Sequence, residues 1–97
     1  MRKRYLQVSY RNGKPLAAYL YLPRQTADKS ARVERREQGL LVDYAADGRP
    51  IGIEITAPTK MSLSFVNQLL TDLNQQVATA DELAPLLFAG QASRTPA

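Results

Sequence analysis

Carboxylates are the main reactive side chains in this sequence, because it contains neither histidine nor cysteine. Without histidine, the commonest general base is missing, and so are the Ser-His and Cys-His pairs of nucleophilic catalysis. Without either residue type, zinc sites and other metal sites with nitrogen or sulfur ligands are excluded. We therefore expect a non-enzymatic protein with no cofactor and no bound metal.

Asp43 and Glu54 are carboxylates whose spacing suggests a shared site. In the hairpin predicted below they fall on one sheet face, in diagonal positions about 7–8 Å apart. Such a pair could carry out acid–base chemistry or hold Mg²⁺. The interpretation that we favour is a set of surface ion pairs with residues such as Arg32 or Arg36, since such pairs are common and weak.

Positive charge is concentrated in the first 60 residues, which contain 12 Lys/Arg against 6 Asp/Glu. Four tyrosines interleave with these cations: Tyr5, Tyr10, Tyr19 and Tyr21. Aromatic side chains on a basic sheet stack and hold single-stranded nucleic acid. The candidate nucleic-acid contacts are Arg4, Arg11, Lys14, Arg32, Arg35 and Arg36. The alternative is a solvated sheet surface, because tyrosine also suits strands for ordinary packing reasons.

The elements that must position these residues begin with a hairpin over residues 40–55. Asp47-Gly48 predicts a two-residue type I′ turn, in which both central residues have positive φ. The predicted pairs are Leu40 with Ile55, Val42 with Ile53 and Tyr44 with Ile51. All six side chains are apolar and share one face, and a one-residue slip would turn the apolar set of one strand away from it.

Two further strand signals flank this hairpin. Asn12-Gly13 predicts a turn between strands over 5–10 and 16–22. The segment 16–22 is apolar on both faces, which predicts a central strand covered on each side. Residues 32–37 contain Val33 as their single apolar residue, and the surrounding charges predict an exposed strand at a sheet edge.

Helical periodicity starts at residue 62, where Ser62 or Ser64 can cap a helix. The apolar stripe consists of Leu63, Val66, Leu69, Leu70, Leu73 and Val77. Thr79-Ala80-Asp81-Glu82 fits a capping box for a shorter second helix. Leu83, Leu86 and Leu87 would form its apolar face, and Gly90 suits its C-terminal cap.

These elements predict one α+β domain over residues 1–90, with a flexible tail over 91–97. Its antiparallel sheet has four to five strands in a hairpin meander (roughly 4–57), and one or two C-terminal helices (roughly 62–89) pack on one face. The helix stripe is expected to cover Val42, Tyr44, Ile51, Ile53 and Ile55. Apolar residues beyond the stripe, such as Phe65 and Phe88, would be covered by a homodimer partner or by a second helix on the other face.

The location expected from the sequence is the cytoplasm, without membrane association. No apolar run approaches the ~20 residues that a spanning helix needs. The basic start is followed by alternating residues rather than by the apolar stretch of a signal peptide. The lack of cysteine suits a reducing compartment.

Three segments between Tyr5 and Ala57 resemble the domain-of-unknown-function 2283 family of short prokaryotic proteins. Residues 17–22 are similar to the family's alanine-then-tyrosine strand, and 39–44 and 47–55 occur in the family's order and spacing. The matching motif residues are Asp43, Tyr44, Asp47, Gly48, Gly52 and Glu54. The turn over 10–14 is basic where the family has acidic residues, and 61–97 extend beyond its common short members.

The resemblance implies a bacterial protein without an established activity. Some family members look like partners encoded beside toxin-like proteins, which implies an antitoxin-like role. The function we expect is therefore a small non-enzymatic protein-interaction module, whose partner is a second copy or a neighbouring-gene product. The alternative is a small basic protein that binds nucleic acid through its sheet face.

Overall fold

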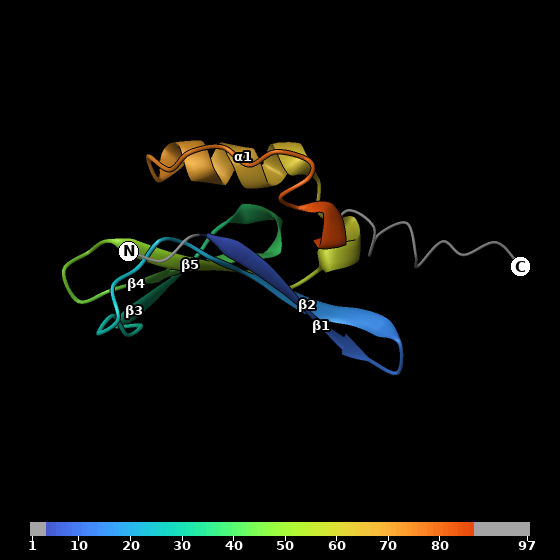
Figure 1. Ribbon diagram of the computed structural model, residues 1–97, viewed down its shortest axis with the longest axis horizontal. Coiled ribbons are helices and arrows are strands. Elements are labelled where there is room, and N and C mark those ends of the chain that lie inside the picture. Colours follow the sequence, from blue (N-terminus) through green and yellow to red (C-terminus); the bar gives the residue numbers. More distant parts are fainter. Residues whose placement is uncertain (1–3, 87–97) are drawn as a thin grey trace, which may run out of the picture.

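Residues 4–86 of the chain are described by the structure, which is a computed structural model. One antiparallel sheet contains the strands β1 (Tyr5–Arg11), β2 (Lys14–Tyr21), β3 (Arg32–Arg35), β4 (Leu40–Tyr44) and β5 (Pro50–Ile55). Their order is β1-β2-β5-β4-β3, so a hairpin and a three-strand meander are joined where β2 pairs with β5. Helix α1 (Leu63–Asp72) lies over one face (Figure 1). The predicted α+β class and antiparallel sheet of four to five strands are confirmed, with five strands observed.

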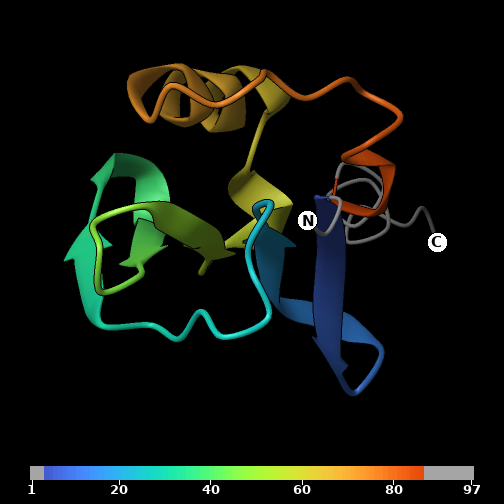
Figure 2. The ribbon, with the colours of Figure 1, turned by 60° about the vertical axis from the view of Figure 1, so that its left-hand side comes forward.

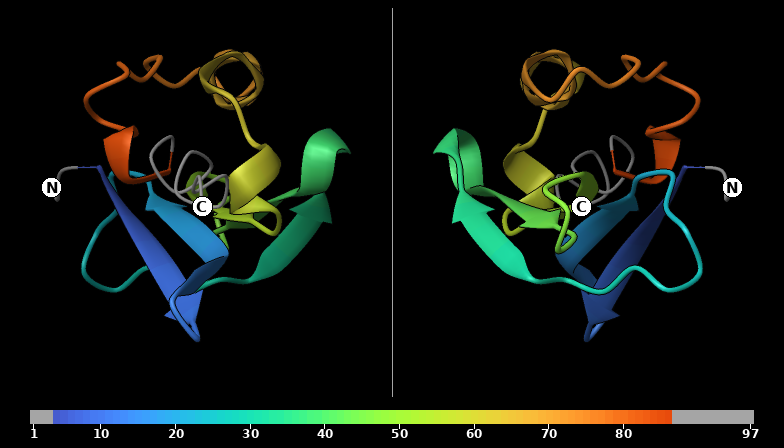
Figure 3. Two further views of the ribbon diagram at one scale, coloured as in Figure 1. Left: turned by 90° about the vertical axis from the view of Figure 1, so that its right-hand side faces the viewer. Right: turned by 90° about the vertical axis from the view of Figure 1, so that its left-hand side faces the viewer.

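The central position predicted for β2 is confirmed, because it lies between β1 and β5. Ala18 and Leu20 point to the α1 side and are buried. The prediction that both faces of β2 are covered is wrong. Tyr19 and Tyr21 on the other face are only half-buried, and no helix among residues 4–86 lies on that side (Figures 2 and 3).

The predicted turn between β1 and β2 is confirmed, and its two central residues have the positive φ values of a type I′ turn. Asn12 and Gly13 have φ values of 53° and 76° and are flanked by the pair Arg11 and Lys14. The pairing shifts between Ser9 and Tyr10, and the extra residue is Leu16 on β2. The bulge therefore lies on β2, and β1 has no inserted residue at this point.

The 40–55 hairpin differs from the prediction at its turn. The pairs Leu40–Ile55 and Val42–Ile53 are confirmed, but Tyr44 pairs with Pro50 instead of Ile51 because the register shifts after Asp43. Gly48 alone in this turn has positive φ, at 92°. Its N–H donates to the Ala45 carbonyl (2.9 Å), and the Ala45 N–H donates to the Arg49 carbonyl (2.8 Å). In this longer turn only Gly48 has positive φ, whereas in a type I′ turn Asp47 would also need positive φ.

Helix α1 begins as predicted, because Ser62 Oγ accepts the N–H of Phe65 (3.3 Å). It ends earlier than the apolar stripe suggests. Asn74 adopts φ 58°, and the N–H groups of Asn74 and Gln75 donate to the carbonyls of Thr71 (3.0 Å) and Leu70 (2.8 Å). These two bonds form a Schellman motif, which closes the helix. Val77 therefore lies beyond the helix and is 51% exposed, so its predicted place in the stripe is wrong.

The core lies between α1 and the sheet. Val66, Leu69 and Leu70 pack in one buried cluster with strand residues. The cluster includes four of the five strand residues that the helix was expected to cover: Val42, Tyr44, Ile53 and Ile55. Ile51 is buried as well, outside this cluster.

Residues 75–86 return beside α1 on the same side of the sheet (Figure 3). The Asn67 side chain holds this return segment: its amide nitrogen donates to the Ala78 carbonyl (3.0 Å), and its oxygen accepts the Ala78 N–H (2.6 Å). Leu83 and Leu86 are buried, as predicted. A helical turn starts at residue 84. The predicted contributions of Leu87, Phe88 and Gly90, and the tail over 91–97, lie outside the described residues.

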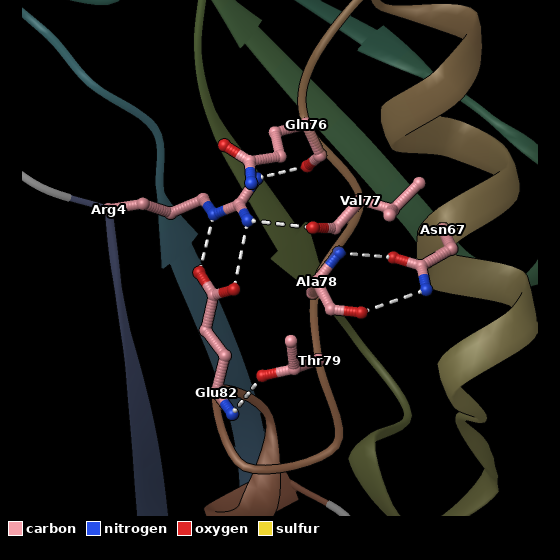
Figure 4. A network of polar contacts seen from close by, with 7 residues as sticks. All are labelled: Arg4, Asn67, Gln76, Val77, Ala78, Thr79 and Glu82. Atoms are coloured by element: carbon pink, nitrogen blue, oxygen red, sulfur yellow. Dashed lines mark hydrogen bonds and ion pairs between the residues drawn. The ribbon is translucent and has the colours of Figure 1, made fainter.

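The predicted capping box is half confirmed. Thr79 Oγ1 accepts the N–H of Glu82 (3.1 Å). The carboxylate of Glu82 does not return to the Thr79 backbone but binds Arg4 (Figure 4). In the part of the chain that the structure describes, no helix has the length and apolar character needed to cross a membrane.

Replacement of Ile53 by alanine should lower the free energy of unfolding by about 2–5 kcal/mol, because the side chain is fully buried and its loss leaves a cavity. Val33→Ala is the matched control, because Val33 is an exposed strand residue on β3; it should change stability by less than about 0.5 kcal/mol. Urea unfolding followed by circular dichroism measures both. Equal losses for the two variants would contradict the core described here.

Candidate functional site

The sheet face opposite α1 is called the open face below. It carries most of the polar side chains of the strands. Side chains alternate along each strand, so the observed register determines which residues share this face. Its members are Tyr5, Gln7, Ser9, Arg11, Ala17, Tyr19, Tyr21, Val33, Arg35, Leu41, Asp43, Gly52 and Glu54. Asp43 and Glu54 share the face in diagonal positions, as predicted, since they lie opposite Gly52 and Leu41.

Tyr19 connects three strands of the open face. Its hydroxyl donates to Asp43 Oδ2 (2.5 Å), across the intervening strand β5. The phenol lies directly over Gly52, where a Cβ atom would overlap it. Ser30 donates to the other carboxylate oxygen of Asp43 (3.2 Å). Two motif residues therefore have related structural roles: Asp43 accepts the hydrogen bond of Tyr19, and Gly52 leaves space for its ring.

The protonation state of Tyr19 follows from this environment. Burial of the phenol, and then its hydrogen bond to Asp43, raises the pKa of Tyr19 well above its ordinary value of 10.0. The hydroxyl is therefore a proton donor at neutral pH. The Tyr19–Asp43 pair fixes side chains in place and does not supply a phenolate nucleophile or a free general base.

A row of aromatic rings continues from Tyr19 to the edge of the sheet. Tyr21 lies 4.6 Å from Tyr19 between ring centroids, and it stacks on Tyr5 at 4.3 Å with an interplanar angle of 14°. Arg24 lies over the Tyr21 ring at 5.3 Å and donates to the Ile51 carbonyl (2.6 Å). Tyr5 is 51% exposed. The row is thus held on one side and open to solvent at its outer end.

Tyr44 belongs to a different cluster, at the β3 edge on the α1 side. Its hydroxyl donates to Glu34 (3.1 Å), which also forms ion pairs with Arg36 (2.7 Å) and Arg32 (3.6 Å). The hydrogen bond from Arg36 is the main reason that the pKa of Glu34 is lowered. Arg32 lies 4.1 Å from the centre of the Tyr44 ring. The expected pairing of Arg32 and Arg36 with Asp43 or Glu54 is therefore wrong: their carboxylate partner is Glu34.

Asp47 and Gly48 have a local role at the turn between β4 and β5. Arg49 pairs with Asp47 (2.6 Å) and with Asp28 (2.6 Å), and its hydrogen bonds lower the pKa of both carboxyl groups. These contacts tie the turn to the connection between β2 and β3. Glu54, the remaining motif residue, is exposed on the open face.

The six candidate nucleic-acid contacts do not gather on one face. Arg11 and Lys14 flank the β1–β2 turn, and Arg35 lies on the open face at the opposite edge. Arg32 and Arg36, at the same edge, form ion pairs with Glu34 on the α1 side. The structure therefore separates the cations that the sequence presents as a group.

Arg4 is a structural residue. Its guanidinium binds both carboxylate oxygens of Glu82 (2.5 and 2.9 Å) and donates to the carbonyls of Gln76 (2.5 Å) and Val77 (3.2 Å), as Figure 4 shows. Its side chain is only 12% exposed. It holds the return segment against the start of β1, and four of its five N–H donors are used in these bonds.

Sequence reasoning named Tyr19 as a possible stacking residue but missed its bond to Asp43, and it missed Arg24 as a site residue. The sequence does indicate the position of Tyr19, because the tyrosines of the strand over 16–22 lie on the face that the helix stripe does not cover. Nothing local marks Arg24, whose carbonyl partner is 27 residues away. Within residues 4–86, no group of three or more His, Cys, Asp or Glu side chains is placed to hold a metal ion.

A groove of about 900 Å³ lies between α1 and the short 3₁₀ helix Glu37–Gly39. Leu40, Phe65 and Leu69 form its apolar part, and Arg36 and Asp72 contribute opposite charges. It holds none of the motif residues. We therefore place the candidate site on the open face.

Gly52→Ala should destabilise the protein by about 1–3 kcal/mol, because the added methyl group overlaps the Tyr19 phenol. In a Tyr19→Ala background the same change should cost clearly less, because the overlapping ring is gone. A double-mutant cycle by thermal or urea unfolding measures the difference. Additive effects would show that Tyr19 is not the reason for glycine at this position.

Alkaline pH should destabilise the wild-type protein more steeply than Tyr19→Phe. The pKa of Tyr19 is higher in the folded than in the unfolded state, so its contribution is fully present below pH 10 and is lost as the pH rises further. The measurement is the free energy of unfolding from pH 8 to 11 for both proteins. Parallel curves would contradict the raised pKa.

Comparison with known proteins finds a family match for the central segment. Residues 17–57 match the family model described as Protein of unknown function (DUF2283). The matched segment begins in β2 and runs just past β5, so it contains Tyr19 and all six motif residues, while α1 lies outside it. No curated protein and no solved structure matches the chain. The resemblance drawn from the sequence is confirmed: the segment 17–57 of this chain matches the model of the DUF2283 family of proteins of unknown function.

Proposed function

We propose that this chain is a non-enzymatic protein-interaction module that binds a partner protein through the open face, around Tyr5 and Tyr21. The observation that carries the proposal is the exposed, stacked Tyr5–Tyr21 pair on a sheet face that no described helix covers. Tyrosine and arginine are enriched in protein interfaces and at their energetic hot spots. Arg24, beside Tyr21, adds that second residue type.

Preorganisation supports this choice of surface. Tyr21 is fixed by stacking on Tyr5, by Arg24 and by a hydrogen bond from its hydroxyl to Gln7 (3.2 Å). Tyr19 is fixed by Asp43. Side chains that are already ordered lose little conformational entropy on binding, so more of the contact energy remains as affinity.

Charge favours a protein over nucleic acid as the partner. The aromatic row shares the open face with the carboxylates Asp43 and Glu54, which would repel phosphate groups. Phosphate contacts from Lys and Arg supply most of the affinity of nucleic-acid binding. The cations of this chain are instead divided between the hairpin turn, the far edge and internal ion pairs.

The chemistry of the open face supports a binding role over a catalytic one. Its phenol and carboxylate at Tyr19 and Asp43 are bonded to each other, and the chain has no histidine or cysteine to activate a nucleophile. An antitoxin-like role, in which the partner is the product of a neighbouring gene, would be one form of this module. The partner would then lie on the same face.

The test is capture from a lysate of the source cell with tagged wild-type protein, Tyr5→Ala and Tyr10→Ala, each with and without nuclease. Tyr5 and Tyr10 are matched, because both are exposed tyrosines of β1, at 51% and 57%, but only Tyr5 belongs to the open face. We expect one protein to be captured in stoichiometric amounts by the wild type and by Tyr10→Ala. Its capture should be lost with Tyr5→Ala and unaffected by nuclease.

Two results would overturn the proposal. Equal capture by all three proteins would move the interface away from the open face. Captured nucleic acid, with binding that weakens steeply as salt concentration rises, would favour a nucleic-acid partner. Thermal unfolding of each variant confirms that the fold is intact.

A further inference from the structure

The two edges of the sheet are unequally protected against pairing with another strand. β3, at one edge, has four residues, of which three are charged. β1, at the other edge, contains six consecutive uncharged residues, Tyr5–Tyr10, and no proline. Charged residues and short length protect edge strands, whereas long uncharged edges serve as templates for pairing. β1 lacks the protection that β3 has.

β1 is also available for pairing among the residues that the structure describes. Its one neighbour in the sheet is β2. The bulge that interrupts this pairing inserts Leu16 into β2, so consecutive residues of β1 remain in line along the outer edge. Arg4, just before the strand, is directed to the return segment and does not run along this edge.

We propose that β1 pairs in antiparallel orientation with β1 of a second copy of this chain, centred on Val8. A two-fold symmetric pairing brings the same surface of both copies together, so each residue meets its mirror position in the sequence. Read outward from Val8, the strand is matched in character. Gln7 meets Ser9, which are both polar, and Leu6 meets Tyr10, which are both apolar or aromatic.

The Val8-centred register pairs more residues of β1 than the adjacent registers do. Centring on Val8, the middle residue of Tyr5–Arg11, lets all seven residues find partners, whereas centring on Gln7 or Ser9 leaves two of them unpaired. A shift by a single position in the pairing would place the two apolar sets on opposite faces. The Val8-centred pairing also brings Tyr5 of one copy beside Arg11 of the other, in a cation–aromatic contact.

The pairing explains an exposed aromatic residue on the α1 side of β1. Tyr10 is 57% exposed, and it follows Leu6 and Val8, which are partly buried against the core. In the dimer it is covered by Leu6 of the second copy. The two sheets become one sheet of ten strands, which is close to the upper size of open sheets. The pairing uses the backbone edge of β1 rather than the open face, although Tyr5 takes part in both surfaces.

Cysteine cross-linking tests the register, because the wild-type chain contains no cysteine. Gln7→Cys and Ser9→Cys alter exposed residues of β1, and Gln68→Cys on α1 is the control for random collision. Directly opposed residues lie within the Cα distance that a disulfide allows, whereas diagonal ones lie at or beyond its limit. Mixing Gln7→Cys with Ser9→Cys protein should therefore yield a disulfide-linked heterodimer under mild oxidation. Intact mass spectrometry distinguishes it from either homodimer.

A charge-swap pair provides a second readout. Gln7→Lys/Ser9→Lys places like charges opposite each other across the proposed interface and should give monomers in light scattering. Gln7→Lys/Ser9→Glu places opposite charges there and should remain dimeric at the same concentration.

Each outcome decides the inference. The heterodimer, with no excess of either homodimer over the Gln68→Cys control, supports the Val8-centred pairing. Preferential homodimers of Gln7→Cys or of Ser9→Cys overturn this register. A wild-type protein that is monomeric at all concentrations, or cross-linking no greater than the control, overturns the pairing of β1 altogether. Cross-linking at residues 7 and 9 is measured on the purified protein without a partner, so its failure would leave the proposal for the open face standing.

Discussion

A hydrogen bond from the Tyr19 hydroxyl to Asp43 joins β2 to β4 over the strand between them, and the organisation of the open face depends on it. The reach across β5 is possible only because residue 52 is glycine. With Tyr19 fixed, Tyr21 and then Tyr5 stack in a row toward the edge. One polar contact, with the Tyr21 ring beside it, thus orders a surface that no helix within residues 4–86 covers.

The parts of the fold that the sequence predicts are those determined by local alternation and by turn chemistry. The pairs Leu40–Ile55 and Val42–Ile53, the Asn12-Gly13 turn, the Ser62 cap and the exposed edge strand all follow from neighbouring residues. The family resemblance has the same origin, because its motifs are strands and a turn. Errors arise where two local rules compete. At Asp47-Gly48 the demand for positive φ falls on glycine alone, and at Asn74 a left-handed residue ends a helix whose apolar spacing continues to Val77.

The candidate site is less predictable, because its contacts join segments that are distant in sequence. Asp43 and Glu54 could be placed on one face from the hairpin register, but the partner of Asp43 is 24 residues away in β2. Among the basic residues, composition alone could not separate Arg4, which is enclosed by a carboxylate and two carbonyls, from Arg11 at an exposed turn. Glu34 attracts Arg32 and Arg36 because alternation along a short strand places all three on one side.

The clasp between Arg4 and Glu82 spans 78 positions of the chain. During synthesis the sheet strands emerge first. The guanidinium of Arg4 can bind its carboxylate partner only after the turn that contains Glu82 has been synthesised. Contacts of such long sequence separation close late, after the loop entropy between them has been overcome. A clasp that forms after the rate-limiting step of folding retards unfolding while leaving the speed of folding nearly unchanged. In this protein, Arg4 would therefore act on the lifetime of the folded state rather than on how quickly that state is reached.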